Sequence, residues 1–284
     1  MGKPVIALMY DFDKTLCTKD MQEYSFIPKI EMDSGDFWDE VNKLAREKQM
    51  DRILAYMHLM LKKSKAKDQS IRRQDFVNLG KDLVYYPGVN DWFSRINHLV
   101  EDMEIVVEHY IISSGLKEII EGSSIFKNFH EIFACEFLYD ANGVACWPKN
   151  AVNYTTKTQF LFRINKGVFD LSNDTDLNKY TPEDDRPVPF RNMIYIGDGI
   201  TDVPCMKLIK TNGGYSIAVH QKEDQQKVKE LIIHERVDFI ALADYSENSE
   251  LDKIVRDIIM KIVMVESLKE KSKQQIAFLT KDDE

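Results

Sequence analysis

The sequence predicts an α/β fold, with a Rossmann-like three-layer core around a parallel sheet and an inserted α-helical bundle cap. Short apolar runs at residues 5–10, 105–112, 193–196 and 215–219 alternate with segments of helical periodicity. This alternation is typical of a parallel sheet covered by helices on both faces. Residues 18–85 differ from the rest, because they are rich in charge and methionine and nearly free of glycine and proline.

Residues 18–85 are expected to form a small separate helical bundle, inserted into a main domain of residues 1–17 and 86–284. Apolar side chains recur in the bundle at the spacing of amphipathic helices. They are Trp38, Val41, Leu44, Ala45, Ile53, Leu54, Met57, Leu61, Phe76, Leu79 and Leu83. Packing inside a helical bundle is the simplest explanation of this methionine- and aromatic-rich stripe.

The remaining elements follow from periodicity and turn signals. Pro87-Gly88 marks the return to the core, and the turn sequence at residues 140–143 marks a hairpin. Helices are expected at 89–100, from 116 to 120, at 158–164, 223–233 and 251–268; strands at 132–138, 144–147 and 237–241; a loop at 170–191; and a frayed acidic tail at 281–284.

Composition excludes several classes of protein. A net charge of -9 argues against a general nucleic-acid binder, which needs a basic face. The four cysteines (Cys17, Cys135, Cys146 and Cys205) form no paired zinc or disulfide pattern. The N-terminus shows no signal-peptide pattern, and no apolar run approaches the ~20 residues of a membrane span. We therefore expect a cytoplasmic protein that binds neither nucleic acid nor membranes.

Four acidic residues follow two of the apolar runs. Asp11 and Asp13 come directly after residues 5–10, and Asp198 and Asp202 lie in the sequence GDGITD after residues 193–196. Ligands of open α/β sheets bind at the carboxyl ends of the strands, so these acids are expected to converge there. Carboxylates so close together repel one another unless a cation lies among them, and an all-oxygen site suits Mg²⁺. Such a metal would hold a phosphate in line for attack, which gives Asp11 the role of nucleophile and Asp13 that of proton donor and acceptor.

The chain resembles the haloacid dehalogenase superfamily, and most closely its phosphoserine-phosphatase-like subgroup. The resemblance is carried by residues 11–15 (DFDKT), residues 112–115 (ISSG), Lys157 and residues 197–202. It implies that residues 18–85 are a helical cap between the first and second motifs and that residues 1–17 and 86–284 are the catalytic core. It also implies an aspartyl-phosphate on Asp11, and Mg²⁺ as cofactor.

The resemblance also assigns roles to individual residues. Asp11, Asp198 and the backbone carbonyl of Asp13 are implied to bind the metal. Ser113, Ser114, Gly115 and Lys157 are implied to bind the phosphoryl group, with Asp202 and Thr15 supporting them.

Some of these residues also have simpler readings. Ser113 and Asp202 could cap the helices that follow them, and Lys149 and Lys166 compete with Lys157. The subgroup commonly has a glutamate where this chain has Asp20 and a glycine where it has Ser114, which argues against phosphoserine as the substrate. Substrate contacts are expected from the cap, with Asp20, Glu23, Tyr24, Arg46 and Arg52 as candidates.

The sequence thus favours a phosphatase acting on a small phosphorylated metabolite. A phosphotransferase or mutase with the same aspartyl-phosphate is the first alternative. A binding or regulatory protein with little turnover is the second. The sequence leaves the oligomeric state open.

Overall fold

A computed structural model of the protein describes residues 3–24, 26–67 and 71–279. Its strands form one seven-stranded sheet in the order β4-β3-β2-β1-β5-β6-β7. They are β1 (Val5–Tyr10), β2 (Val106–Leu116), β3 (Glu131–Tyr139), β4 (Ala145–Asn150), β5 (Met193–Gly197), β6 (Tyr215–His220) and β7 (Phe239–Leu242). Every neighbouring pair is parallel except β3 and β4, which form the expected hairpin. The predicted fold class is confirmed.

The helices alternate with the strands as the periodicity predicts. They are α1 (Met21–Tyr24), α2 (Phe26–Lys29), α3 (Ser34–Lys48), α4 (Arg52–Ala66), α5 (Arg73–Leu79), α6 (Val89–Leu99), α7 (Lys117–Glu121), α8 (Lys157–Lys166), α9 (Asp174–Asn178), α10 (Val203–Thr211), α11 (Gln225–Ile233) and α12 (Glu250–Leu279). Short 3₁₀ turns lie at Gly80–Asp82, Phe126–Asn128, Glu183–Asp185, Phe190–Asn192, Ile200–Asp202 and Lys222–Asp224.

Two expectations about these elements need correction. The segment 170–191 is not only loop, because Asn173 caps the one-turn helix α9 by accepting a hydrogen bond from the Asp176 N–H. Helix α12 continues beyond residue 268, because no glycine or proline lies between Glu250 and Leu279 to stop it. The tail at 281–284 lies outside the described residues.

Helices cover both faces of the sheet. Tyr10 and Tyr195 point to opposite faces, because Tyr195 pairs in register with Met9, the residue before Tyr10. On one face, Tyr10 accepts a hydrogen bond from Trp92 of α6. On the other face, Tyr195 lies beside Lys157 of α8, because Tyr195 and Lys157 both donate to Asp202. An ion pair links α6 to α12, so these two helices lie on the same face.

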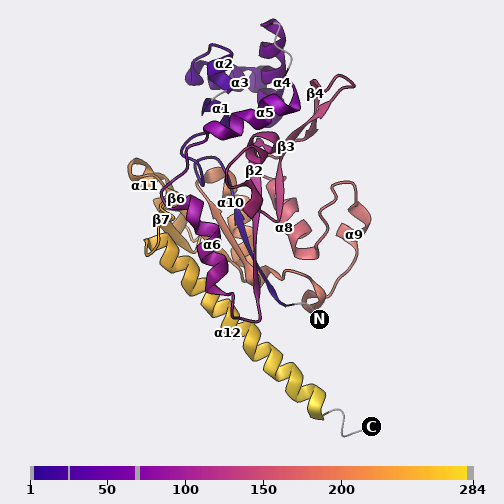
Figure 1. The fold of residues 1–284 in the computed structure, drawn as a ribbon, viewed down its shortest axis with the longest axis vertical. Helices are drawn as coiled ribbons and strands as arrows, with labels where there is room; N and C mark the ends of the chain where they lie inside the picture. Colours follow the sequence, from indigo (N-terminus) through magenta and orange to yellow (C-terminus); the bar gives the residue numbers. More distant parts are fainter. Residues whose placement is uncertain (1–2, 25, 68–70, 280–284) are drawn as a thin grey trace.

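Helices α1–α5 gather at one end of the molecule, beyond the carboxyl ends of the central strands (Figure 1). Residues 18–85 thus contain helices, as their periodicity predicts, and their division from the core as a cap stays a prediction. Helix α12 extends away from the opposite end (Figure 1). Among the described residues, no helix combines the length and the apolar character that crossing a membrane requires.

Candidate active site

Three neighbouring strands bring the predicted site residues together. Strand β1 lies between β2 and β5, with Tyr10 level with Ile111 on one side and Ile196 on the other. Asp11 and Asp198 follow β1 and β5, and Ser113 lies near the end of β2. The Asp11 N–H donates to the Ile196 carbonyl at 2.9 Å, which extends the sheet by one bond and fixes the start of the Asp11 loop.

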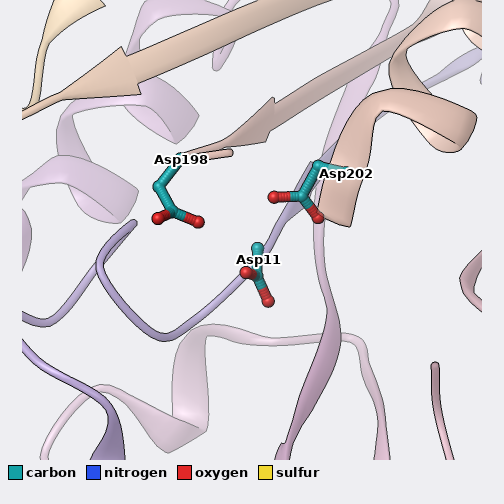
Figure 2. A group of neighbouring side chains, drawn as sticks. All are labelled: Asp11, Asp198 and Asp202. Atoms are coloured by element: carbon teal, nitrogen blue, oxygen red, sulfur yellow. The ribbon is translucent and has the colours of Figure 1, made fainter. Parts of the chain in front are cut away.

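Three carboxylates converge at this edge of the sheet. Oxygens of Asp11, Asp198 and Asp202 all lie within 4.8 Å of one another. Figure 2 shows the three side chains pointing into one common space. Burial raises the pKa of Asp11 and of Asp198, and the neighbouring carboxylates raise both further. Concentrated negative charge with oxygen donors alone is the chemistry of a divalent-cation site, so these residues fit Mg²⁺.

A buried lysine lies against this acidic cluster. The Nζ of Lys157 is 3.0 Å from Oδ1 of Asp11 and 2.7 Å from Oδ1 of Asp202. Burial lowers the pKa of Lys157, but the two carboxylates outweigh it and raise the pKa overall. Asp202 also accepts from the Tyr195 hydroxyl at 2.8 Å and makes no side-chain cap bond to α10. Asp202 therefore orients Lys157 and is not simply a helix cap.

The two competing lysines lie elsewhere. Lys149 pairs with Glu136 on the hairpin at 2.8 Å. Lys166, at the end of α8, donates to the carbonyls of Leu177 and Lys179. Of the three candidates, Lys157 is the one that contacts Asp11.

The Asp13 carboxylate is separate from the other three. It accepts a hydrogen bond from the Met21 N–H of α1 at 2.8 Å. Burial raises the pKa of Asp13 strongly, and Asp20 and Asp11 raise it further. Its side chain is not part of the carboxylate group that could hold a metal. The metal contact expected through its backbone carbonyl stays a prediction.

The segment Ser113–Gly115 forms a buried turn at the end of β2. Gly115 N–H donates to the Ser113 Oγ at 3.0 Å. The residue that caps α7 is Leu116, so Ser113 is not the cap of that helix. The Oγ atoms of Ser114 and Thr15 are buried without a hydrogen-bond partner in the part of the chain that the structure describes. A closely approaching ligand could satisfy such unpaired hydroxyls.

The side chain of Met21 lies close against Gly115. A Cβ there would lie 2.1 Å from Cε of Met21 and 3.0 Å from Oδ2 of Asp13. Helix α1, the Asp13 carboxylate and the turn are therefore in close contact.

Three of the five candidate substrate residues, Asp20, Glu23 and Arg52, make polar or ring contacts with one another or with neighbouring side chains. Asp20 forms an ion pair with Lys14 at 2.6 Å. Lys14 directly follows Asp13 and adopts a positive φ of 56°. Glu23 accepts from the indole N–H of Trp38 at 3.2 Å, and the guanidinium of Arg52 lies 5.9 Å from the Trp38 ring.

The other two candidates, Tyr24 and Arg46, lie outside these contacts. The Tyr24 hydroxyl bonds to Thr18 and to the Val84 carbonyl, and Arg46 is exposed near the end of α3. Sequence reasoning assigned Trp38 to the core and gave Tyr195 no role at the site. Each of them fits the apolar pattern of its helix or strand, and that pattern does not indicate that the indole N–H of Trp38 or the hydroxyl of Tyr195 forms a hydrogen bond at the site.

Comparison with known proteins agrees with this geometry. Residues 8–207 match the family described as haloacid dehalogenase-like hydrolase. The chain is 28% identical to an uncharacterized protein of Borreliella burgdorferi, over 87% of this chain and 94% of that protein. A phosphoserine phosphohydrolase-like protein from Francisella tularensis has a similar structure (TM-score 0.51, 18% identity, 83% of this chain and 94% of that one). So does a substrate-bound phosphoserine phosphatase complex (TM-score 0.56, 12% identity, 89% and 98%). At these identities the two structural likenesses concern the fold.

Proposed function

The chain belongs to the haloacid dehalogenase-like hydrolase family, and from this premise we propose that it is a Mg²⁺-dependent phosphatase of a small phosphomonoester. The observation that carries the proposal is that Asp11 and Asp198, at the ends of adjacent strands, meet each other, and that Lys157 of α8 contacts Asp11 there. A nucleophile, a fixed cation and a metal-binding acid at one point are the parts that phosphoryl transfer requires.

The first step transfers the phosphoryl group to the protein. A carboxylate oxygen of Asp11 attacks phosphorus and forms an aspartyl-phosphate, while the bond from phosphorus to the ester oxygen breaks. Asp13 donates its proton to the departing oxygen, which leaves as an alcohol.

The second step releases phosphate. Asp13, now a carboxylate, takes a proton from a water molecule whose oxygen attacks phosphorus. The bond between phosphorus and Asp11 breaks, so that Asp11 is again a carboxylate and Asp13 again an acid. One carboxyl group cannot serve as both nucleophile and proton carrier, which explains the pair.

The other residues bind and orient. The buried Lys157 ammonium offsets the charge of Asp11 and of the phosphoryl oxygens, and Asp202 holds it in place. Ser113, whose Oγ accepts from Gly115, has its hydroxyl hydrogen available for a phosphoryl oxygen. Asp11, Asp198 and the Asp13 carbonyl would hold Mg²⁺, which when bound neutralises negative charge on the transferring group.

Helices α1–α5 would act as the cap that covers the site and selects the substrate. The Lys14–Asp20 pair and the Glu23–Trp38–Arg52 group offer both charges and an aromatic face. These features fit a small polar phosphorylated metabolite.

The direct test is release of phosphate from a panel of phosphomonoesters, with and without Mg²⁺. We expect Mg²⁺-dependent turnover that Asp11→Asn reduces by about four orders of magnitude, because the nucleophile is removed. Full activity in that variant would disprove the assignment of Asp11. Transfer to added acceptor alcohols in preference to water would favour a phosphotransferase, and absence of turnover despite Mg²⁺ binding would favour a regulatory protein.

A further inference from the structure

The peptide group between Ser114 and Gly115 is held at both ends. Its carbonyl accepts from the Tyr56 hydroxyl at 2.8 Å and from the Cys135 thiol at 3.3 Å. Its N–H donates to Ser113 Oγ at 3.0 Å. Tyr56 belongs to α4, among the helices beyond the end of the sheet, and it is almost fully buried. A residue of the cap region therefore contributes to the orientation of the turn that carries Ser113.

The identity of residue 115 makes this restraint important. Residue 115 is a glycine, against which the end of the Met21 side chain packs so closely that it would have to move if a Cβ were present. Glycine also leaves the backbone freer to rotate than any other residue does. Because a peptide group is planar, a bond that fixes the Ser114 carbonyl also fixes the direction of the Gly115 N–H.

Helix α4 makes a second contact with the core, at its first turn. Asp51 caps the helix through Oδ1, which accepts from the N–H groups of Ile53 and Leu54. Its other oxygen, Oδ2, accepts from Nδ2 of Asn153 at 2.8 Å. The Asn153 carbonyl accepts from the Lys157 N–H at 2.9 Å, so Asn153 shapes the turn that leads into Lys157.

We propose that Tyr56 and Asp51 are positioning residues, through which the docking of α4 sets the phosphate-binding groups of Ser113–Gly115 and Lys157. The inference rests on the proposed function, because it concerns the same site. It explains why one helix contacts two catalytic segments that lie on different strands and helices of the core. With α4 displaced, both segments lose a restraint and bind phosphate less well.

Two variants remove single bonds and keep the packing. Tyr56→Phe deletes only the hydroxyl. Asp51→Asn keeps one oxygen for the helix cap but places an amide NH₂ against Asn153. The matched control is Lys63→Gln, which breaks the ion pair of α4 with Glu40 (2.6 Å) and touches neither core segment.

The experiment measures affinity for inorganic phosphate in the presence of Mg²⁺ by calorimetry, together with kcat, KM and the unfolding temperature. Loss of one such hydrogen bond should weaken phosphate binding about five- to tenfold, and kcat/KM should fall at least as much. Loss of a buried hydrogen bond should also lower the unfolding temperature of both variants slightly, so affinity is measured well below that temperature. The phosphate affinity of the Lys63→Gln control should match that of the unaltered protein.

The outcomes separate this inference from the proposed function. If the unaltered protein binds phosphate and both variants bind it equally well, the positioning role is wrong and the proposed function stands. If affinity falls only in proportion to a lowered unfolding temperature, the two residues are merely structural. If the unaltered protein neither hydrolyses phosphomonoesters nor binds phosphate, the proposed function fails, and this inference fails with it.

Discussion

The Lys157 ammonium and the Asp202 carboxylate form an ion pair whose members are 1% and 0% exposed, at 2.7 Å. A charge withdrawn this far from water is tolerated only when a partner of opposite sign lies beside it. Lys157 has two such partners, since Asp11 is 3.0 Å away. Asp11 and Asp202 therefore share one cation, and a change in either carboxylate alters the charge balance of the other.

Asp202→Asn tests this arrangement. The amide still accepts from Tyr195 but removes one negative charge, so Lys157 is left with Asp11 alone. Activity should fall about 10- to 100-fold, and the free energy of unfolding by about 3 kcal/mol, measured by phosphate release and urea denaturation. Glu136→Gln, which breaks the exposed pair with Lys149, should cost less than about 1 kcal/mol. Equal effects of the two variants would contradict the buried-pair argument.

Asp13→Asn should separate proton transfer from nucleophilic attack. The amide oxygen still accepts from the Met21 N–H, so α1 stays in place, but no proton can be donated to the leaving oxygen. Turnover of an alkyl phosphate should fall about 10²- to 10⁴-fold. The rate of the first step, followed as a burst of p-nitrophenol from p-nitrophenyl phosphate, should fall much less, because that leaving group needs no proton. Equal losses of this first-step rate for both substrates would count against Asp13 as the acid.

Mg²⁺ should stabilise the folded protein measurably. At a metal concentration 100 times its Kd, the free energy of unfolding should rise by about 2.7 kcal/mol, seen as a higher unfolding temperature. Asp198→Asn should abolish this rise. Without Mg²⁺ the same variant should be no less stable than the unaltered protein, because its carboxylate no longer repels those of Asp11 and Asp202. An unchanged Mg²⁺ response in the variant would remove Asp198 from the metal site.

The buried His109 should make the free energy of unfolding depend on pH. The Tyr10 hydroxyl, which accepts from Trp92, donates to Nδ1 of His109, while Nε2 donates to Asn97. Burial lowers the pKa of His109 to about 3, well below its ordinary value. The unfolded chain therefore binds a proton that the folded chain excludes, and stability is lost as the pH falls below about 6.5, by up to about 1.4 kcal/mol per pH unit.

His109→Gln removes this titration. Its free energy of unfolding, measured in urea between pH 7 and pH 4, should fall less steeply than that of the unaltered protein. Parallel curves for the two proteins would show that the folded and unfolded chains protonate His109 at the same pH, which would contradict the lowered pKa.

Most of the fold could be predicted because each strand has a short apolar run with its own turn signals. The acids of residues 11–13 and 198–202 could be placed together because parallel strands end at the same edge of a sheet. The length of α12 could not be predicted, because its exposed half lacks the apolar periodicity that marks a helix packed on a core.

The contacts between α4 and the core could not be predicted either. Tyr56 and Asp51 fit the helix pattern as an ordinary core residue and an ordinary cap. Their second partners, Ser114 and Asn153, are 58 and 102 residues away. Such pairs come together only when the whole chain packs, so the periodicity of the sequence does not predict them.

The central place of β1 has a consequence for synthesis of the protein. The strand that leads into Asp11 is synthesised before both of its neighbours in the sheet, β2 and β5, which begin at residues 106 and 193. On the ribosome its apolar residues have no partner strand on one side until β2 is translated, and none on the other side until β5 is translated. Pairings so distant in sequence are slow to form and leave unpaired edges prone to aggregation. The nascent chain therefore has to keep this segment protected until β5 arrives.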